Sequence, residues 1–237
     1  MDKESIRQQV WDMLDDEGIA RFPFPPHNRI PNFDGADAAA SRLTSLSWWE
    51  AVDVLKCNPD APQRPVREQA LVAGKTVLMA KPRLKSSRPF IVIDPDTIDE
   101  PTDAATIGGA DEHGVAVGLD EVPPVDAIIS GSVAVDRRGR RIGKGEGYSD
   151  LEFAILLETG AIDRSVSVAT TVHDRQVFDE RLPSEPHDVS LDHTATPTTV
   201  HHVTDRPNRP TGLVESLIDD GRQSEIPALV DVLERNK

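Results

Sequence analysis

Hydrophobic positions recur along the chain in short blocks whose spacing alternates between that of a helix and that of a strand. Within residues 2–17, Ile6, Val10 and Leu14 fall at helical spacing, which predicts an amphipathic N-terminal helix. Four prolines in residues 21–32 exclude a helix there and predict an extended connector.

The chain beyond this connector alternates between helix-like and strand-like segments. We expect helices over 36–46, 64–73, 151–158 and 226–233. We expect strands over 51–55, 76–80, 90–93, 125–129, 131–135 and 166–172, with a short alternating segment over 187–191. Such alternation is typical of an α/β fold in which helices cover both faces of a mainly parallel sheet. The pattern therefore predicts a three-layer, Rossmann-like sandwich whose ligands bind beyond the carboxyl ends of the strands.

Two segments interrupt this pattern. Residues 94–124 are acidic and contain glycine and proline, and we expect them to form an irregular surface insertion with little core. The proline-rich stretch 206–210 separates the last predicted helix from the rest. We expect one α/β domain over 1–204 and a proline-bounded helical tail over 205–237, which can dock on its own sheet or on another subunit.

The charge composition of the chain argues against one class of function and indicates the kind of organism it comes from. The chain has 41 acidic against 26 basic residues, and this balance argues against binding to the phosphate backbone of nucleic acids. Only seven of the basic residues are lysines, a composition typical of a high-salt cytoplasm, so we expect a halophilic archaeal source over an ordinary acidic protein.

The sequence also predicts the cellular location. No run approaches the roughly 18–20 apolar residues of a membrane span, and the first residues do not resemble a signal peptide. The single cysteine, Cys57, cannot form an internal disulfide, and we expect it to be buried. We therefore predict a cytoplasmic protein with a small-molecule substrate and no membrane partner.

Residues 136–150 carry the clearest chemical signal. In the sequence DRRGRRIGKGEGYSD, Gly143, Gly145 and Gly147 alternate directly before a predicted helix. Glycines at this spacing let backbone N–H groups surround an anion, and the helix N-terminus adds a favourable dipole. Arg141 and Lys144 concentrate positive charge there, which favours phosphate. The pattern is neither a Walker loop nor GxGxxG, and a glycine-rich hairpin with solvated arginines is the alternative.

The same residues resemble a known family. Residues 143–150, GKGEGYSD, are similar to the G-R-G-x-G-Y-Y-D loop of the 5-formyltetrahydrofolate cyclo-ligases, also called methenyltetrahydrofolate synthetases. Lys3 and Arg7 match the K-x-x-x-R of the family's first helix. Further along, Gln176, Leu182-Pro183 and His187-Asp188 resemble its Q…LP…HD pattern. The chain looks most like a divergent, cyclo-ligase-like branch.

The resemblance implies a fold of the cyclo-ligase (NagB/RpiA/CoA-transferase-like) type and an ATP-dependent ligase. Its reaction would close 5-formyltetrahydrofolate to 5,10-methenyltetrahydrofolate with ATP and Mg²⁺. Carried over by position, Lys144 and Tyr148 would be catalytic, and Asp150 and Asp188 would hold Mg²⁺. The implied nucleotide-binding residues are Lys3, Arg7, Arg141, Gly143, Lys144, Gly145, Gly147 and Tyr148.

Several positions depart from the family pattern. Ser149 replaces the second tyrosine, Leu151 replaces a frequent basic residue, and Glu146 stands where lysine can occur. Residues 56–63 replace the segment in which the orthodox enzymes place a folate-contacting glutamate. Two alternatives therefore stay open: an ATP-dependent enzyme acting on another pterin or small molecule, and a non-catalytic relative that binds nucleotide.

Other chemical candidates are weaker. Five histidines lie between residues 173 and 202, without the spacing of a zinc site. No G-x-S-x-G motif of a serine hydrolase is present. Trp48 and Trp49 could stack on a pterin, but we expect them to anchor the second helix.

Overall fold

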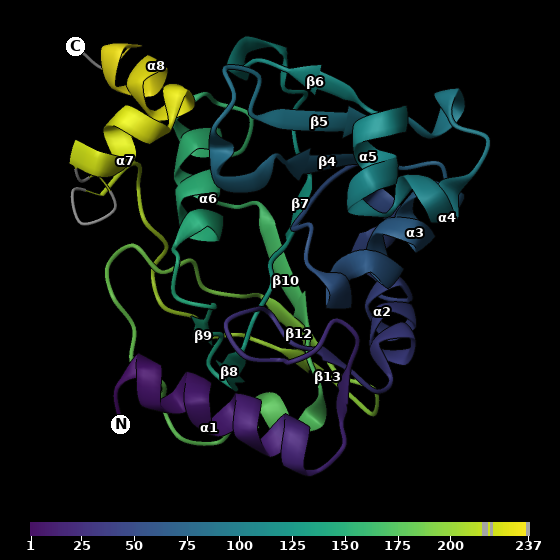
Figure 1. Cartoon of the computed structure of the whole chain (residues 1–237), viewed down its shortest axis with the longest axis vertical. Coiled ribbons are helices and arrows are strands. Elements are labelled where there is room, and N and C mark those ends of the chain that lie inside the picture. Colours follow the sequence, from purple (N-terminus) through teal and green to yellow (C-terminus); the bar gives the residue numbers. More distant parts are fainter. Residues whose placement is uncertain (215–217, 219, 236–237) are drawn as a thin grey trace.

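The computed structural model of the chain describes residues 1–214, 218 and 220–235. Among these residues, eight strands form a central sheet in the order β13-β12-β10-β7-β3-β4-β5-β6 (Figure 1). Its middle strands are parallel: β12 (His193–Ala195), β10 (Ser167–Thr171), β7 (Ala127–Ile129), β3 (Val54–Cys57) and β4 (Thr76–Ala80). Antiparallel strands complete both edges: β5 (Phe90–Ile93) and β6 (Val115–Val117) on one side, and β13 (Val200–His202) on the other. The prediction of an α/β fold with a mainly parallel sheet is confirmed.

Helices cover both faces of this sheet. On one face lie α2 (Ala36–Thr44), α3 (Arg64–Val72), α4 (Pro101–Ala104) and α5 (Ile107–His113), and on the other lie α6 (Tyr148–Glu158), α7 (Asp220–Glu225) and α8 (Pro227–Arg235) (Figure 1). Strand β4 shows how the two cores arise, because its successive side chains point to opposite faces. Leu78 belongs to the core under α6, whereas Val77 and Met79 belong to the core under α2 and α3. Short 3-10 turns connect these elements at Ser47–Ala51, Ala61–Gln63, Pro82–Leu84, Pro95–Thr97, Leu119–Glu121 and Asp174–Gln176.

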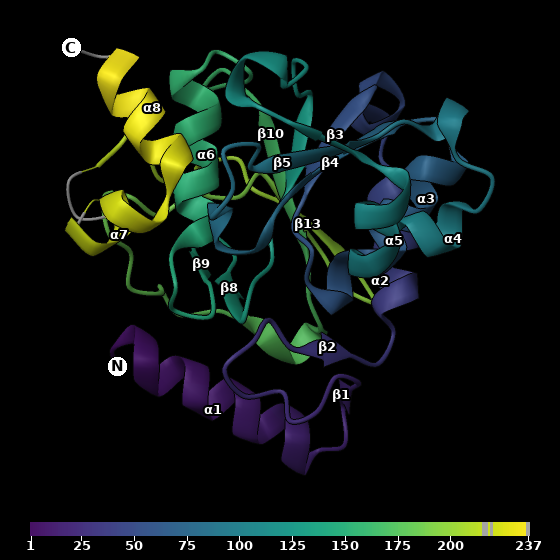
Figure 2. The same ribbon diagram turned by 45° about the horizontal axis from the view of Figure 1, so that its top comes forward.

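A smaller unit, separate from the central sheet and its covering helices, lies at one end of the molecule. Helix α1 (Lys3–Asp16) packs there beside a three-stranded sheet of β11 (Val177–Phe178), β8 (Ala134–Asp136) and β9 (Arg141–Ile142) (Figure 2). A two-stranded ribbon of β1 (Ala20–Arg21) and β2 (Asn32–Phe33) follows α1. The Asp2 carboxylate caps α1 by accepting a 2.8 Å hydrogen bond from the Ser5 amide. The apolar face of α1 is buried, so Lys3 and Arg7 are held at a fixed distance from the glycine loop.

The segment 94–124 differs from its prediction as an irregular insertion with little core. It contains α4, α5 and β6, and Ala104, Ala105 and Ala110 are fully buried. Small residues explain the error. Helices rich in alanine and glycine pack closely against their neighbours, but they lack the periodic large hydrophobic residues from which a buried helix is predicted. At Gly109, an added Cβ would come within 2.0 Å of the Asp103 carbonyl oxygen. This segment therefore belongs to the α/β sandwich.

Two predicted strands also differ. In place of the strand predicted over 131–135, β8 begins three residues later and ends one residue later, and it pairs with β9 and β11 rather than within the central sheet. Residues 187–191 form no strand, although Val189 and Leu191 are buried. Their backbone groups bond elsewhere: the Leu191 amide donates to the Gly139 carbonyl at 2.8 Å.

The C-terminal helix docks on its own chain. Ala228, Leu229 and Val232 of α8 are buried in the same core as Leu151 and Ile155 of α6. No helix in the described part of the chain is both long and apolar enough to cross a lipid bilayer.

Candidate functional site

The glycine loop connects β9 to α6 and has a shape that needs glycine. Gly145 and Gly147 have positive φ angles of 109° and 70°, a region that side chains disfavour. Gly147 is the N-cap of α6, a helix of 11 residues whose N-terminus favours a negatively charged ligand. The Gly143 carbonyl accepts a 2.7 Å hydrogen bond from Nε of Arg7, which ties the loop to α1.

Two cavities lie on either side of this loop. The smaller has a volume of about 520 Å³ and the larger about 680 Å³. Gly143, Gly147 and Asp150 line both of them. The loop is therefore a shared wall, and a ligand in one cavity would lie next to a ligand in the other.

The smaller cavity is formed by α1, the glycine loop and the segment 183–188. Lys3, Arg7, Gly145 and Asp188 line it, together with the three residues of the shared wall. Nζ of Lys3 lies 2.8 Å and 2.7 Å from the two carboxylate oxygens of Asp188. Lys3 and Asp188, which are 185 residues apart in sequence, thus meet at this cavity.

Carboxylates in the smaller cavity are suited to a hard cation. The side chains of Glu185, His187 and Asp188 bring ligand atoms within 4.8 Å of one another. Asp150, the other expected metal ligand, accepts hydrogen bonds from Arg141 Nη2 at 2.6 Å and from the Val189 amide at 2.9 Å. Mg²⁺ prefers oxygen ligands, so the carboxylates of this cavity fit the ion, whereas the His187 imidazole does not, and Asp150 lies outside the cluster of Glu185, His187 and Asp188.

Arg141 plays a different structural part from the one its position implied. It is only 4% exposed, and its guanidinium bonds Asp150 and the Gly131 carbonyl, the latter at 3.2 Å. It lines the larger cavity together with Lys144 and Tyr148. The predicted site residues are thus divided between the two sides of the loop.

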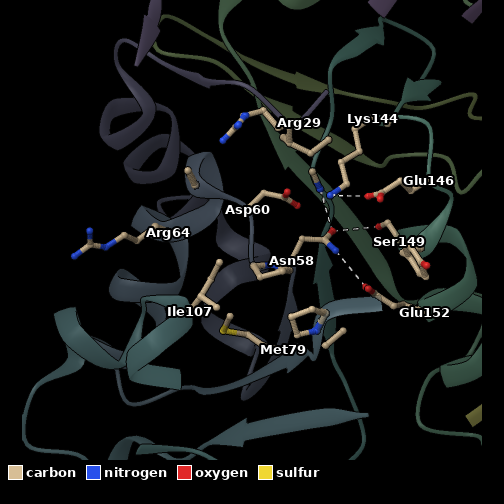
Figure 3. Close-up of a pocket in the computed structure, with 18 of the residues that line it drawn as sticks. Arg29, Asn58, Asp60, Arg64, Met79, Ile107, Lys144, Glu146, Ser149 and Glu152 are labelled. Atoms are coloured by element: carbon tan, nitrogen blue, oxygen red, sulfur yellow. Dashed lines mark hydrogen bonds and ion pairs between the residues drawn. The ribbon is translucent and has the colours of Figure 1, made fainter. Parts of the chain in front are cut away.

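The larger cavity lies at the carboxyl ends of β3, β4 and β7, where an α/β sheet binds its ligands. Asn58 and Asp60 follow β3, Lys81 follows β4, and Gly131 follows β7. Asp60 points toward the space between Asn58 and Lys144 (Figure 3). This end of the sheet supplies some of the polar groups of the cavity.

The charges of Asp60 and Lys144 influence each other across this cavity. Burial raises the pKa of the Asp60 carboxyl above its ordinary value, although the positive charge of Lys144 opposes this shift. Burial disfavours the charged form of Lys144, but its hydrogen bond to Glu146 and the negative charge of Asp60 outweigh that effect and raise its pKa. Lys144 is therefore a cation, held 2.8 Å from the Glu146 carboxylate.

A buried polar network forms the floor of the larger cavity. Lys56 and Glu152 form an ion pair, and Nδ2 of Asn58 donates to Glu152 at 3.1 Å. Oδ1 of Asn58 accepts from the Gly131 amide at 3.0 Å and from the Ser149 hydroxyl at 3.1 Å (Figure 3). The network joins β3 to the first turn of α6.

The three departures from the family loop have structural partners. Ser149 bonds Asn58 and also lies 2.8 Å from the Ser130 hydroxyl. Glu146 pairs with Lys144, and Leu151 is fully buried in the core under α6. These substitutions therefore belong to a loop built around Asn58 and Lys144.

Sequence reasoning missed Lys56, Asn58, Asp60 and Glu152. One signal was present, because the polar residues Asn58 and Asp60 directly follow a predicted buried strand. The contact of Asn58 with Glu152 joins positions 94 residues apart, and a local pattern does not reveal it.

The walls and mouth of the larger cavity are mostly apolar. The lining includes the apolar residues Met79, Ile91, Ile107, Phe22 and Pro23. The Phe22 side chain is 78% exposed at the mouth, and the Phe22 carbonyl accepts a 2.8 Å hydrogen bond from Asn32. Arg64 lies on the side of the cavity opposite Glu152, whereas Arg29 lies in the same part of the view as Lys144 (Figure 3).

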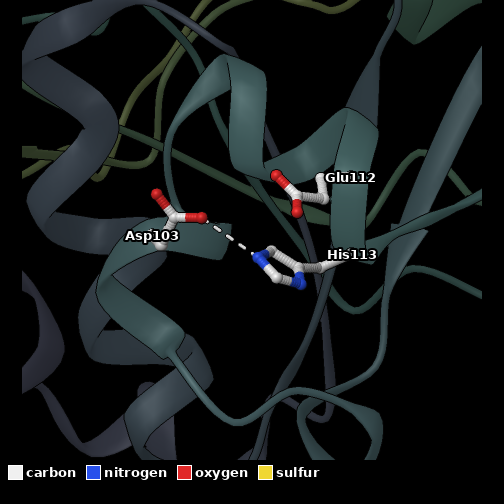
Figure 4. Close-up of side chains that lie close together, drawn as sticks. All are labelled: Asp103, Glu112 and His113. Carbon is white, nitrogen blue, oxygen red and sulfur yellow. Dashed lines mark hydrogen bonds and ion pairs between the residues drawn. The ribbon is translucent and has the colours of Figure 1, made fainter.

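Other groupings of reactive side chains lie outside both cavities. Asp103, Glu112 and His113 lie close together on α4 and α5, where His113 pairs with Asp103 at 3.0 Å (Figure 4). Trp48 stacks on His193 and also contacts Trp49, away from both cavities. Cys57 is buried, and burial raises the pKa of its thiol. We assign no reaction to these residues.

The fold and the two cavities together indicate the class of protein to which the chain belongs. A parallel α/β sheet that carries a glycine-rich anion loop between two cavities is typical of enzymes that bind two ligands at the carboxyl ends of the strands. The chain belongs to the 5-formyltetrahydrofolate cyclo-ligase family, whose sequence model matches residues 1–197. The prediction of this family is confirmed.

Individual relatives agree with this assignment. The chain is 42% identical over 241 residues to a methenyltetrahydrofolate synthase domain-containing protein of Mus musculus, covering 99% of this chain and 64% of that protein. It is 38% identical to the Homo sapiens protein of the same name, covering 96% of this chain and 60% of that one. The chain thus spans less than two thirds of these curated relatives. Over 90 residues, 34% of this chain and 43% of the other, it is 36% identical to a 5-formyltetrahydrofolate cyclo-ligase of Mycolicibacterium smegmatis.

A solved structure has the same fold. The 5,10-methenyltetrahydrofolate synthetase of Aquifex aeolicus matches 87% of this chain and 95% of its own, with a TM-score of 0.56 and 21% sequence identity.

Proposed function

We propose that this protein closes 5-formyltetrahydrofolate to 5,10-methenyltetrahydrofolate in a reaction driven by ATP and Mg²⁺. The observation that carries the proposal is the glycine loop shared by two cavities. One cavity has the lysine, arginine and carboxylates suited to a metal-bound triphosphate, and the other has the volume and apolar walls suited to a folate. The phosphoryl group would be transferred from one ligand to the other beside the glycine loop that the two cavities share.

The chemistry requires activation of the formyl oxygen. A formamide oxygen is a poor leaving group, so the γ-phosphoryl group of ATP is transferred to it and ADP is released. The N10 amine then attacks the formyl carbon and loses its proton, the carbon–oxygen bond breaks, and inorganic phosphate leaves. Catalysis of phosphoryl transfer consists mainly of positioning and charge neutralisation.

We assign the nucleotide to the smaller cavity. Lys3 and Arg7 would neutralise phosphate charge, and the backbone of Gly143, Gly145 and Gly147 would surround it. Asp150 and Asp188 would hold Mg²⁺, which supplies further charge neutralisation when bound. Arg141 would act through Asp150, whose carboxylate it orients at 2.6 Å.

We assign the folate to the larger cavity, with Lys144 and Tyr148 beside the group that is transferred. The Asp60 carboxylate lies at the centre of the polar end. The pterin ring carries adjacent N–H donors, and a carboxylate can accept two of them at once. Asp60 therefore replaces, in function, the family glutamate that this segment lacks.

The test is an absorbance assay for the methenyl product with purified protein, ATP, Mg²⁺ and 5-formyltetrahydrofolate. The assay is run in molar KCl, because the net charge of −15 supports a high-salt cytoplasm as the protein's environment. An ATP-dependent rise in absorbance is expected. A flat trace from folded protein that binds ATP would contradict the proposal and favour another pterin substrate or a non-catalytic role.

A further inference from the structure

The C-terminal helices contact the glycine loop, although they lie beyond the part of the chain that the family model matches. That match ends at residue 197, whereas α7 and α8 cover 220–225 and 227–235. Both helices lie beside α6 in the two views (Figures 1 and 2). Because α8 is buried against α6, α7 is held close to the first turn of α6.

Arg222 of α7 makes this contact. Its Nη2 donates a 2.6 Å hydrogen bond to the carbonyl oxygen of Glu146, and its guanidinium carbon lies 5.7 Å from the centre of the Tyr148 ring. A charge-assisted hydrogen bond is roughly twice as strong as a neutral one, and the cation–π contact adds a smaller attraction. Glu146 and Tyr148 flank Gly147, the N-cap of α6, so one side chain contacts the residues on both sides of this cap.

The two ends of the loop are held in the same way. Arg7 of α1 bonds the carbonyl of Gly143, and Arg222 of α7 bonds the carbonyl of Glu146. Between these contacts lies Gly145, whose missing side chain gives the backbone wide conformational freedom. Ordering such a segment when the ligand arrives would cost entropy, and tethers at both ends reduce that cost in advance.

We propose that Arg222 is a positioning residue of the nucleotide site, which makes the C-terminal segment a working part of that site. Arg222 holds the loop in the conformation whose backbone N–H groups receive phosphate, and it fixes the Tyr148 ring beside the larger cavity. The kinetic part of this proposal rests on the proposed function, whereas its effect on the loop does not.

The test compares Arg222→Gln with Arg222→Lys and with Arg235→Gln as a matched control. Arg235 lies in the same C-terminal segment and pairs with Asp120 at 2.6 Å, away from the loop. We expect Arg222→Gln to raise the KM for ATP about ten-fold, with a much smaller change in the KM for 5-formyltetrahydrofolate. Arg222→Lys, which keeps the charge, recovers part of this loss, and Arg235→Gln leaves both constants unchanged.

Amide hydrogen exchange of residues 143–148 provides a readout that needs no activity. Faster exchange in Arg222→Gln, confined to these residues, is expected, whereas Arg235→Gln leaves the exchange of the loop unchanged. Unchanged exchange together with unchanged ATP affinity in Arg222→Gln would overturn the proposal, as would an equal effect of Arg235→Gln. If the wild-type protein forms no methenyl product, the proposed function fails, but exchange and binding of MgATP still decide the role of Arg222.

Discussion

The two cavities beside the glycine loop differ in how their charges are paired. In the smaller one, Lys3 pairs with Asp188, and Asp150 pairs with the buried Arg141. In the larger one, no hydrogen bond to the Asp60 carboxylate is found among the described residues, and burial raises its pKa. A ligand that binds in the smaller cavity must therefore replace existing ion pairs of these lysine, arginine and aspartate side chains. A ligand that binds in the larger cavity can instead donate hydrogen bonds to the Asp60 carboxylate. The first arrangement suits a metal-bound polyphosphate, and the second suits a neutral ring with N–H donors.

The largest effect is expected from Asp150→Asn. The amide cannot replace the carboxylate toward Mg²⁺ and leaves the buried Arg141 without its counter-charge. We expect turnover to fall by about 100-fold or more, and the free energy of unfolding to fall by roughly 3 kcal/mol. Steady-state kinetics below the melting temperature and urea unfolding measure the two effects.

The matched control for this variant is Asp179→Asn. Asp179 also pairs with an arginine, Arg137, but the pair is exposed on the surface. Its loss should cost under about 1 kcal/mol and no activity. If Asp150→Asn does not fold, Asp188→Asn, which removes the carboxylate paired with Lys3 in the same cavity, tests the metal assignment instead. Unchanged activity of a folded Asp150 or Asp188 variant contradicts that assignment.

A smaller effect on activity is expected from Asp60→Asn, with an opposite effect on stability. Under the proposed function the variant loses the charge assigned to the N–H donors of the pterin, so the KM for 5-formyltetrahydrofolate should rise about ten-fold, which corresponds to about 1.4 kcal/mol. The KM for ATP should change little. Equal changes in both constants would show that Asp60 does not contact the folate alone.

The stability effect of Asp60→Asn depends on pH. Because burial raises the carboxyl pKa in the folded protein, the wild type loses stability as the pH rises from the ordinary value of 3.8 through that raised pKa. The asparagine does not ionise, so the variant should melt at a higher temperature than the wild type at pH near 8. The difference should shrink when the pH falls below about 4. Melting curves across this range measure the effect, and a constant difference at all pH values argues against it.

A modest effect is expected from Phe22→Ala at the mouth of the larger cavity. Stacking between an aromatic side chain and an aromatic ligand contributes about 0.5–1.5 kcal/mol, so the KM for the folate should rise by roughly three- to ten-fold. Phe24 is a matched control, because it is 58% exposed in the same connector but lies outside the lining of both described cavities. If Phe24→Ala has the same effect as Phe22→Ala, the position of Phe22 at the mouth does not matter.

The smallest effect is expected from Ser149→Ala. The variant removes the hydroxyl that bonds Asn58 and Ser130 but leaves the ion pairs of both cavities in place. We expect a loss of about 1 kcal/mol in the free energy of unfolding and a change in kcat of only about two- to three-fold. Thermal melts and initial rates measure these changes. A loss of activity as large as that of Asp150→Asn would give Ser149 a direct part in the reaction.

The sequence predicted those parts of the fold that local patterns encode. The predicted strands 76–80 and 90–93 coincide with β4 and β5, because each is a run of bulky apolar residues that ends at polar or turn residues. The segment 94–124 was wrongly predicted to be an irregular surface insertion. Its alanines, such as Ala104 and Ala110, are buried through close helix packing, and this kind of packing produces no hydrophobic periodicity in the sequence. Hydrophobic periodicity therefore detects helices and strands buried through large side chains and misses helices buried through alanine and glycine.

The site divides in a similar way. The glycine loop is a local motif, and the resemblance placed Lys3 and Asp188 beside it, where the structure also has them. Asp60 was missed because its environment comes from Lys144 and Glu152, which lie more than 80 residues away in sequence. The roles of these residues, the cytoplasmic location and the high-salt origin stay predictions.

The most direct test of the two-cavity account is a pair of binding titrations on Lys3→Met and Asp60→Asn. MgATP and 5-formyltetrahydrofolate are each titrated into both variants and the wild type by calorimetry. The account predicts that Lys3→Met weakens MgATP about ten-fold and leaves the folate unchanged, and that Asp60→Asn does the reverse. Weaker binding of the same ligand in both variants would contradict the separation of nucleotide and folate by the glycine loop.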